Sequence, residues 1–130
     1  MTTKGNRSGD LRGIAQVALA THDVDRAAAF YRDILGLTEL FCTGGMAFLS
    51  CGGIRLMISP PSAEEFDHAS SILYFDVVDI QAAYEDLQAR GVEFVGGPHC
   101  IGQMGESDVW NAHFRDPDGN LMSLTSTVSV

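Results

Sequence analysis

The sequence predicts an α+β fold made of two βαβββ modules that share one body. Two aspartates suited to start helices, Asp23 and Asp79, stand 56 positions apart. Two glycines suited to end those helices, Gly36 and Gly91, stand 55 positions apart. Strand-like runs surround both helices in the same order, so the chain contains an internal duplication.

Length and charge limit the classes of protein that fit. The chain has 130 residues, 45% of them hydrophobic, which is enough for one domain but not for two independent ones. Eight Lys and Arg face 17 Asp and Glu, a net charge of −9. Nucleic acids and anionic membranes bind to concentrated positive charge, so we expect neither as a partner.

The N-terminus and the cysteines indicate the compartment. Residues 1–12 form a polar tail without the apolar core of a signal peptide, and the longest apolar runs are too short to cross a membrane. Cys42, Cys51 and Cys100 are odd in number and show no Cys-x-x-Cys spacing. We therefore expect free thiols and a cytoplasmic protein.

The first module is predicted over residues 13–58. A mostly apolar strand at 14–20 leads to Asp23, and apolar residues at helical spacing follow as far as Gly36. Three short strands are then expected at 37–42, 46–51 and 54–58, because glycine pairs separate them.

Residues 59–70, rich in proline and charge, are predicted to link the modules, and the second module covers 71–130. Its strands are expected at 71–78, 92–95, 109–115 and 121–125. A helix starts at Asp79, residues 96–108 form a long loop of the length typical of lids or binding loops, and Asp116 to Gly119 form a tight turn. Neither half can be stable alone, so the sheets are expected to pack together with a ligand cleft between them.

Two segments carry a family resemblance: Phe30 to Leu37 (FYRDILGL) and Phe114 to Leu124 (FRDPDGNLMSL). With them, residues 14–125 resemble the vicinal oxygen chelate superfamily, which includes glyoxalase I, extradiol dioxygenases, and bleomycin and fosfomycin resistance proteins. The resemblance implies βαβββ modules curled into a half-open, mixed-sheet barrel with a cleft. It also implies a divalent metal in that cleft and a homodimer in which both chains contribute to each cleft.

The resemblance places the four metal positions at Gln16, Arg55, Ile72 and Ser123. An amide oxygen can bind a metal, but a guanidinium has no free lone pair and isoleucine has no donor atom. A neutral serine hydroxyl binds divalent metals poorly without carboxylates beside it. We therefore expect no metal cofactor. The alternative is a divalent metal held by non-family ligands such as His99 or His113 together with Gln16.

The remaining candidate site residues differ in how well their sequence positions fit a role in the cleft. His22 and His68 fit a solvated surface, whereas His113 alternates with Asn111 and Arg115 on a strand that has one face toward the cleft. Cys100 beside His99 is expected to be an ordinary thiol, since neighbouring residues in an extended segment point to opposite sides. Arg55 is either a bidentate anion ligand in place of the metal, or a surface or salt-bridging residue on a strand whose other face supplies the core. Asp116 and Asp118 fit a turn better than a calcium site.

The leading hypothesis is a protein that binds a small organic molecule in the inter-module cleft, in the manner of the family's drug-sequestering resistance proteins. Phe75 is expected to add apolar area to that cleft. The alternative is a metal-dependent glyoxalase-like lyase or isomerase, or a dioxygenase. The expected ligand-binding residues are Gln16, Arg55, Met57, Tyr74, His99, Trp110, His113 and Ser123.

Overall fold

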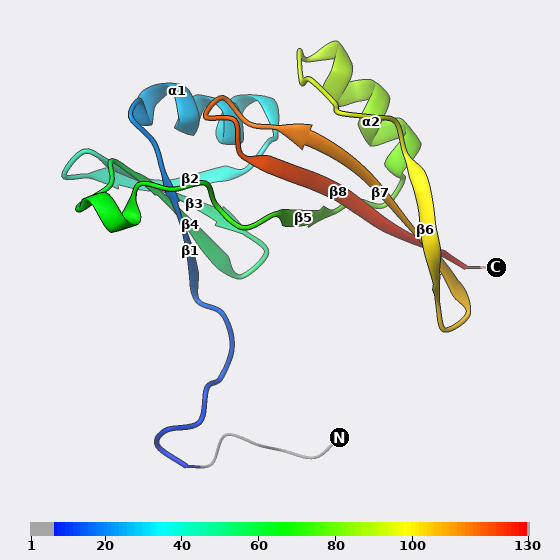
Figure 1. The fold of residues 1–130 in the computed structure, drawn as a ribbon, viewed down its shortest axis with the longest axis horizontal. Coiled ribbons are helices and arrows are strands. Elements are labelled where there is room, and N and C mark those ends of the chain that lie inside the picture. Colours follow the sequence, from blue (N-terminus) through cyan, green and yellow to red (C-terminus); the bar gives the residue numbers. More distant parts are fainter. Residues whose placement is uncertain (1–6, 130) are drawn as a thin grey trace.

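The computed structural model describes residues 7–129, which fold into two four-stranded mixed sheets. Figure 1 shows the two sheets side by side with a helix above each, and the underside of both sheets uncovered. The first sheet contains β1 (Gln16–Ala20), β2 (Thr38–Thr43), β3 (Met46–Cys51) and β4 (Ile54–Ser59). The second sheet contains β5 (Leu73–Asp76), β6 (His99–Met104), β7 (Ser107–Arg115) and β8 (Leu121–Ser129).

Both modules have the same strand topology. The strand orders are β1-β4-β3-β2 and β5-β8-β7-β6, with the first strand of each module parallel to its last. This equivalence confirms the α+β class and the duplicated βαβββ arrangement. The two sheets do not close into a barrel.

The helices begin and end at the expected residues. Asp23 accepts a hydrogen bond from the backbone N–H of Arg26 at the start of α1 (Val24–Ala29), which continues as a π-helical turn, η1 (Phe30–Ile34). Asp79 caps α2 (Ile80–Ala89) in the same way. Gly36 and Gly91 have φ values of 84° and 98°, a left-handed conformation that side chains with a Cβ rarely adopt.

The prediction for residues 92–105 was wrong in two ways. Residues 92–95 form no strand but a single bridge between Phe94 and Phe114, and part of the expected loop 96–108 is β6, paired antiparallel with β7. Every residue of β6 is exposed, so this edge strand has no alternation of apolar and polar residues to reveal it. The linker holds a short 3-10 turn, η2 (Glu64–Phe66).

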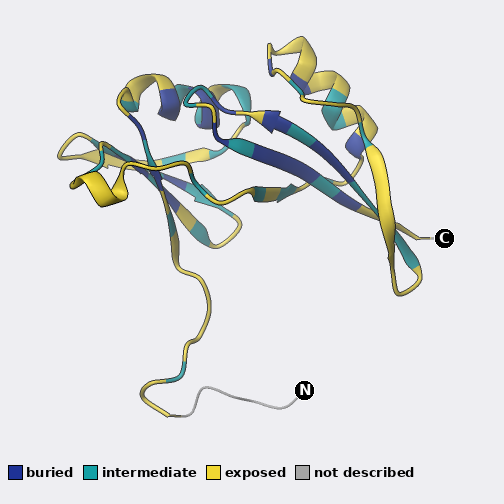
Figure 2. Ribbon diagram, in the orientation of Figure 1, coloured by how far each residue is buried: buried dark blue, intermediate teal, exposed yellow. Residues whose placement is uncertain are grey.

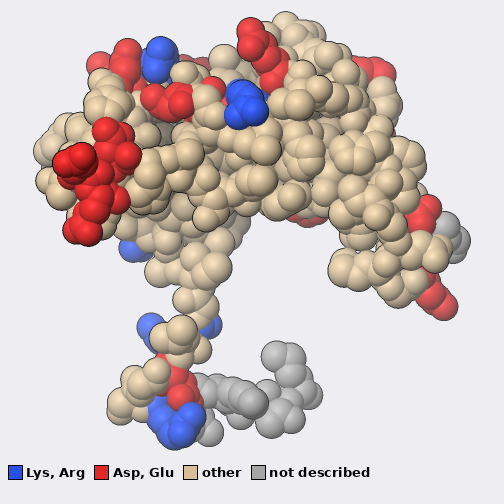
Figure 3. Space-filling view, in the orientation of Figure 1, with Lys and Arg blue, Asp and Glu red and all other residues tan. Residues whose placement is uncertain are grey.

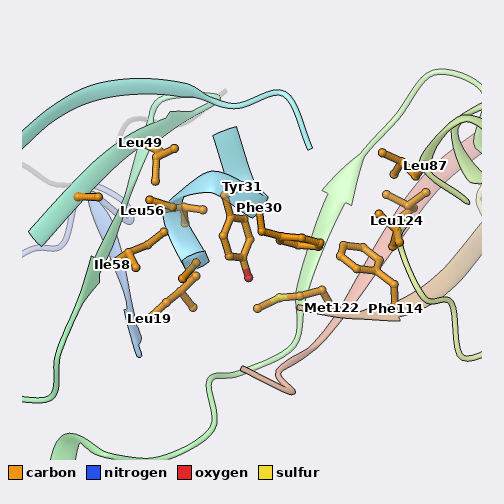
Figure 4. Close-up of a cluster of buried hydrophobic side chains, with 14 of the residues drawn as sticks. Leu19, Phe30, Tyr31, Leu49, Leu56, Ile58, Leu87, Phe114, Met122 and Leu124 are labelled. Carbon is orange, nitrogen blue, oxygen red and sulfur yellow. The ribbon is translucent and has the colours of Figure 1, made fainter. Parts of the chain in front are cut away.

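One apolar core joins the modules on the helix side of the sheets. Figure 4 shows Phe30 from η1 next to Phe114 from the second sheet, and their ring centroids are 6.4 Å apart. Leu19, Leu56 and Ile58 continue the core beneath α1. Figure 2 shows the buried residues concentrated in the helix-facing side and the central strands. Each sheet therefore has a covered face and an open face.

A polar connection reinforces this junction at the turn between β7 and β8. The buried carboxylate of Asp116 accepts hydrogen bonds from the Tyr31 hydroxyl (2.7 Å), the backbone N–H of Asp118 (3.0 Å) and the backbone and side-chain N–H of Asn120 (2.8 and 2.9 Å). Thr21 donates to Asp118 at 2.9 Å. Asp116 and Asp118 thus form the turn and tie it to the first module. Within residues 7–129, no helix has both the length and the apolar character needed to span a membrane.

Candidate functional site

The open face of the first sheet carries Gln16, Arg55 and Met57. Strand alternation turns Leu56 and Ile58 into the core, so their neighbours on β4 point away from it. Gln16 lies opposite Arg55 across the parallel β1–β4 pair. The Arg55 Nε–H donates to the Gln16 amide oxygen at 3.2 Å, and the Gln16 amide nitrogen lies 3.6 Å from the Met57 sulfur. These three side chains therefore form one contiguous patch.

Arg55 is exposed and keeps its terminal amino groups available. Among residues 7–129, it forms no ion pair with a carboxylate. Of the surface and salt-bridging alternatives, the surface position is therefore observed and the salt bridge is not, within the described chain. Through Gln16, the guanidinium is connected to Met57.

A groove of about 590 Å³ lies on the same open face, between the first sheet and the linker. Its volume is within the range of pockets that hold small organic molecules. Phe41 and Phe48 extend the apolar surface beyond the groove, with stacked rings 4.6 Å apart. Figure 3 shows from the side that uncharged residues predominate along the lower edge of the two sheets. The groove is lined by residues including Ala18, Ala20, Met46, Met57, Pro60, Pro61, Phe66 and His68.

The open face of the second sheet is polar. Strand register places Tyr74, Ser123 and His113 in one row across β5, β8 and β7. The Tyr74 and His113 rings are 6.2 Å apart, and the His99 and His113 rings 5.8 Å apart. The structure therefore brings together four of the predicted residues on this face: Tyr74, His99, His113 and Ser123.

A second row on this face contains Asp76, Thr125, Asn111 and His99. Asn111 is only 5% exposed, and its amide oxygen has no hydrogen-bond partner; the buried Nδ1 of His113 also has none. His99 Nδ1 lies 3.1 Å from the carbonyl oxygen of Gly97, so the tautomer that bonds there carries its proton on Nδ1. The sequence interpretation mentioned Asn111 only as a neighbour of His113 and missed Asp76. Their shared face with His113 is visible only once the strand register is known.

Trp110 and Phe75 do not join these residues. Trp110 alternates with Asn111 on β7 and packs against the core on the helix side, and the Phe75 ring lies 6.4 Å from that of Phe114. Cys100 pairs with Trp110, whereas His99 pairs with Asn111 on the open face. The expected separation of His99 and Cys100 is therefore present.

The four metal positions suggested by the resemblance do not fit a divalent metal. The amide oxygen of Gln16 already accepts a hydrogen bond from Arg55. Ser123 is fully buried, and its hydroxyl lies 2.8 Å from the carbonyl oxygen of Leu124. Strand register pairs Ser123 with Tyr74, while Ile72 lies before the start of β5. In the part of the chain from 7 to 129, no group of three His, Cys, Asp or Glu side chains could hold a metal.

Comparison with known proteins gives the family. Residues 13–124 match the Glyoxalase/Bleomycin resistance protein/Dioxygenase superfamily, and the chain belongs to it. It is 27% identical to the uncharacterized protein YraH of Bacillus subtilis, over 85% of this chain and 95% of that one. It is 24% identical to the glutathione transferase FosA of Serratia marcescens, over 88% and 80% of the two chains.

Solved structures show the same fold. An integron cassette protein, VCH_CASS1, from the mobile metagenome of V. cholerae superposes with a TM-score of 0.76. It is 22% identical, with 90% of this chain and 96% of that chain covered. Identity at this level shows a shared fold, so a function has to be argued from the residues of the site.

Proposed function

We propose that this protein binds a small organic molecule that carries an anionic group, and that it does so on the open face of its sheets without a divalent metal. The observation that supports the proposal is the Gln16–Arg55 pair, which replaces metal-binding positions with an unpaired cation beside an apolar surface. The groove supplies apolar area, and the guanidinium supplies orientation.

The charge of the chain makes this cation selective. With a net charge of −9, the molecule as a whole repels anions, so an exposed guanidinium within an apolar face is a local exception. Its planar donors match two oxygens of a carboxylate or phosphate. Gln16 accepts from Nε and thereby restrains the guanidinium beside β1.

Titration with benzoate, followed by NMR, tests the proposal, with benzyl alcohol as the neutral counterpart. Because Arg55 is exposed, we expect Arg55→Gln to weaken benzoate binding about two- to fivefold, as for an exposed ion pair. Benzyl alcohol binding should not change. Arg12→Gln makes the same charge change on the exposed N-terminal segment and should affect neither probe. Equal loss in both variants would mean that only overall charge matters.

Metal loading separates this proposal from the enzymatic alternative. After incubation with zinc, nickel, manganese or iron and removal of excess metal, we expect far less than one metal ion per chain. A content near one ion per chain that depends on His99 or His113 would instead support the metal-dependent glyoxalase-like lyase, isomerase or dioxygenase.

We further propose a cytoplasmic homodimer. The outer strands of both sheets carry exposed apolar side chains: Leu40 and Phe41 on β2, Ile101 and Met104 on β6. Apolar edge strands favour pairing with another chain, so a second copy is the partner we infer. The three cysteines are free thiols, which suits a reducing compartment. Sedimentation should show about twice the 14.0 kDa of one chain, and a 14.0 kDa species alone at micromolar concentration would refute the dimer.

A further inference from the structure

The open face of the second sheet contains polar groups that the fold itself leaves without partners. Two buried atoms there, the amide oxygen of Asn111 and Nδ1 of His113, have no hydrogen bond within the described chain. They belong to residues two positions apart on β7, on the same side of the strand. A protein interior rarely keeps such groups, because burial without a partner costs free energy.

We propose that Asn111 and His113 form a recognition pair for a carboxamide group of the bound molecule. This inference rests on the proposed function, since it names a second chemical group of the same ligand. Arg55 on the first sheet would select the anionic group, and the second sheet would select an uncharged polar one. The amide of Asn111 lies on the face of β7 opposite the apolar core residues Ala112 and Phe114.

The chemistry of the pair favours an uncharged group that both donates and accepts hydrogen bonds. The side-chain amide of Asn111 has one acceptor and two N–H donors, and a neutral imidazole has one donor and one acceptor. A carboxamide satisfies both groups whichever way the amide and the imidazole are oriented. An ion would be desolvated here without a compensating countercharge from the pair itself. Asp76, in the same row as Asn111, further disfavours an anion.

The neighbouring side chains shape the approach to this pair. Tyr74 and His99 both lie near the His113 ring, with centroid distances of 6.2 and 5.8 Å, and both are exposed. Ser123 makes its hydrogen bonds to backbone carbonyls and leaves the pair unpartnered. A carboxamide can therefore reach Asn111 and His113 when the exposed His99 ring moves aside, between flanking rings that suit a planar group.

Titration with benzamide tests the proposal, with acetophenone as a matched probe that lacks the amide N–H. In the wild-type protein, benzamide should shift the NMR signals of the Asn111 side-chain amide and of the His113 ring, and acetophenone should bind more weakly. Asn111→Leu keeps the approximate volume and removes the hydrogen-bonding groups. We expect this variant to lose benzamide affinity at least fivefold and to be as thermally stable as the wild type or more so. Thr127→Val, on an exposed position of β8, is the control and should change neither property.

The outcomes distinguish this inference from the proposed function. If benzoate binds through Arg55 but benzamide leaves the signals of Asn111 and His113 unmoved, the carboxamide assignment is wrong while the proposed function stands. If no probe binds the wild type, both fail. A loss of stability in Asn111→Leu, together with wild-type signals of Asn111 and His113 that benzamide leaves unmoved, would show that the amide has a structural role and would overturn the inference. The wild-type NMR titration gives its answer even if that variant does not fold.

Discussion

Removal of the Tyr31 hydroxyl should destabilise the protein by breaking the polar connection between its modules. Tyr31 is fully buried on η1, and its hydroxyl donates to the buried carboxylate of Asp116 at 2.7 Å. Tyr31→Phe leaves the ring in the core and removes only this donor. One oxygen of a buried carboxylate then loses one of its hydrogen bonds and keeps the bond from the side chain of Asn120.

The expected loss is about 1.5 to 3 kcal/mol in the free energy of unfolding, the range for a hydrogen bond to a charged group. The short distance and the burial of both partners exclude the much smaller values of exposed pairs. An unfolding entropy of about 2.1 cal/mol/K per residue, over a chain of this length, converts the loss to a fall of roughly 5 to 11 °C in the melting temperature.

Urea unfolding followed by circular dichroism measures this change, and Tyr84→Phe supplies a matched control. The Tyr84 ring packs against the core, but its hydroxyl accepts an exposed hydrogen bond from Gln88 at 3.1 Å, so removal of the hydroxyl should cost less than about 0.5 kcal/mol. Equal stability of Tyr31→Phe and the wild type would refute the role of this hydrogen bond. An equal loss in both variants would show that the effect belongs to tyrosine hydroxyls in general.

Three further predictions concern pH, a helix cap and a glycine. Burial and the nearby Asp116 raise the pKa of Tyr31 above its ordinary value, so above about pH 10 the unfolded chain loses this proton while the folded protein keeps it. The wild type should therefore lose about 1.4 kcal/mol of stability per pH unit in that range. Tyr31→Phe should lose less, as measured by urea unfolding at each pH. Asp79→Ala removes the cap of α2 and should cost about 1 kcal/mol in thermal unfolding, whereas no loss would refute the capping role. Gly36→Ala should lower the free energy of unfolding by about 1 kcal/mol, because Gly36 has a left-handed φ of 84°. Gly96→Ala should lower it little, because Gly96 does not have this conformation. Equal urea midpoints for the two variants would contradict this.

The fold could be predicted because its signals are local and occur twice. The caps at Asp23 and Asp79 and the glycines that end the helices depend on a few neighbouring residues. β6 could not be predicted, since an edge strand with both sides exposed needs no apolar alternation. Its identity as a strand depends on hydrogen bonds to β7, a partner that the sequence of β6 does not specify.

The candidate site could be predicted only in part, for a related reason. Tyr74, His113 and Ser123, all three expected to bind the ligand, share a face because of the register between β5, β8 and β7. The metal position, by contrast, was placed at Ile72, whereas the residue opposite Ser123 is Tyr74. Trp110 was expected to add apolar area to the cleft, but neighbouring residues on a strand point to opposite faces, and the side chain of Trp110 lies on the helix side of β7. A shift of one residue along a strand exchanges the two faces, so a correct strand does not ensure a correct site.

The two open faces differ in chemistry, and this difference constrains any ligand that contacts both. In the part of the chain from 7 to 129, the first face has a largely apolar groove and the exposed cation of Arg55, which forms no ion pair there. The second face is polar, with buried atoms of Asn111 and His113 that lack partners in that part of the chain and with the carboxylate of Asp76. A ligand oriented with its anionic end toward the second face would meet Asp76 and leave Arg55 unpaired. The opposite orientation pairs the anionic end with Arg55 and keeps it away from Asp76. The duplicated fold therefore supplies two similar surfaces, and their different side chains give the proposed site a direction.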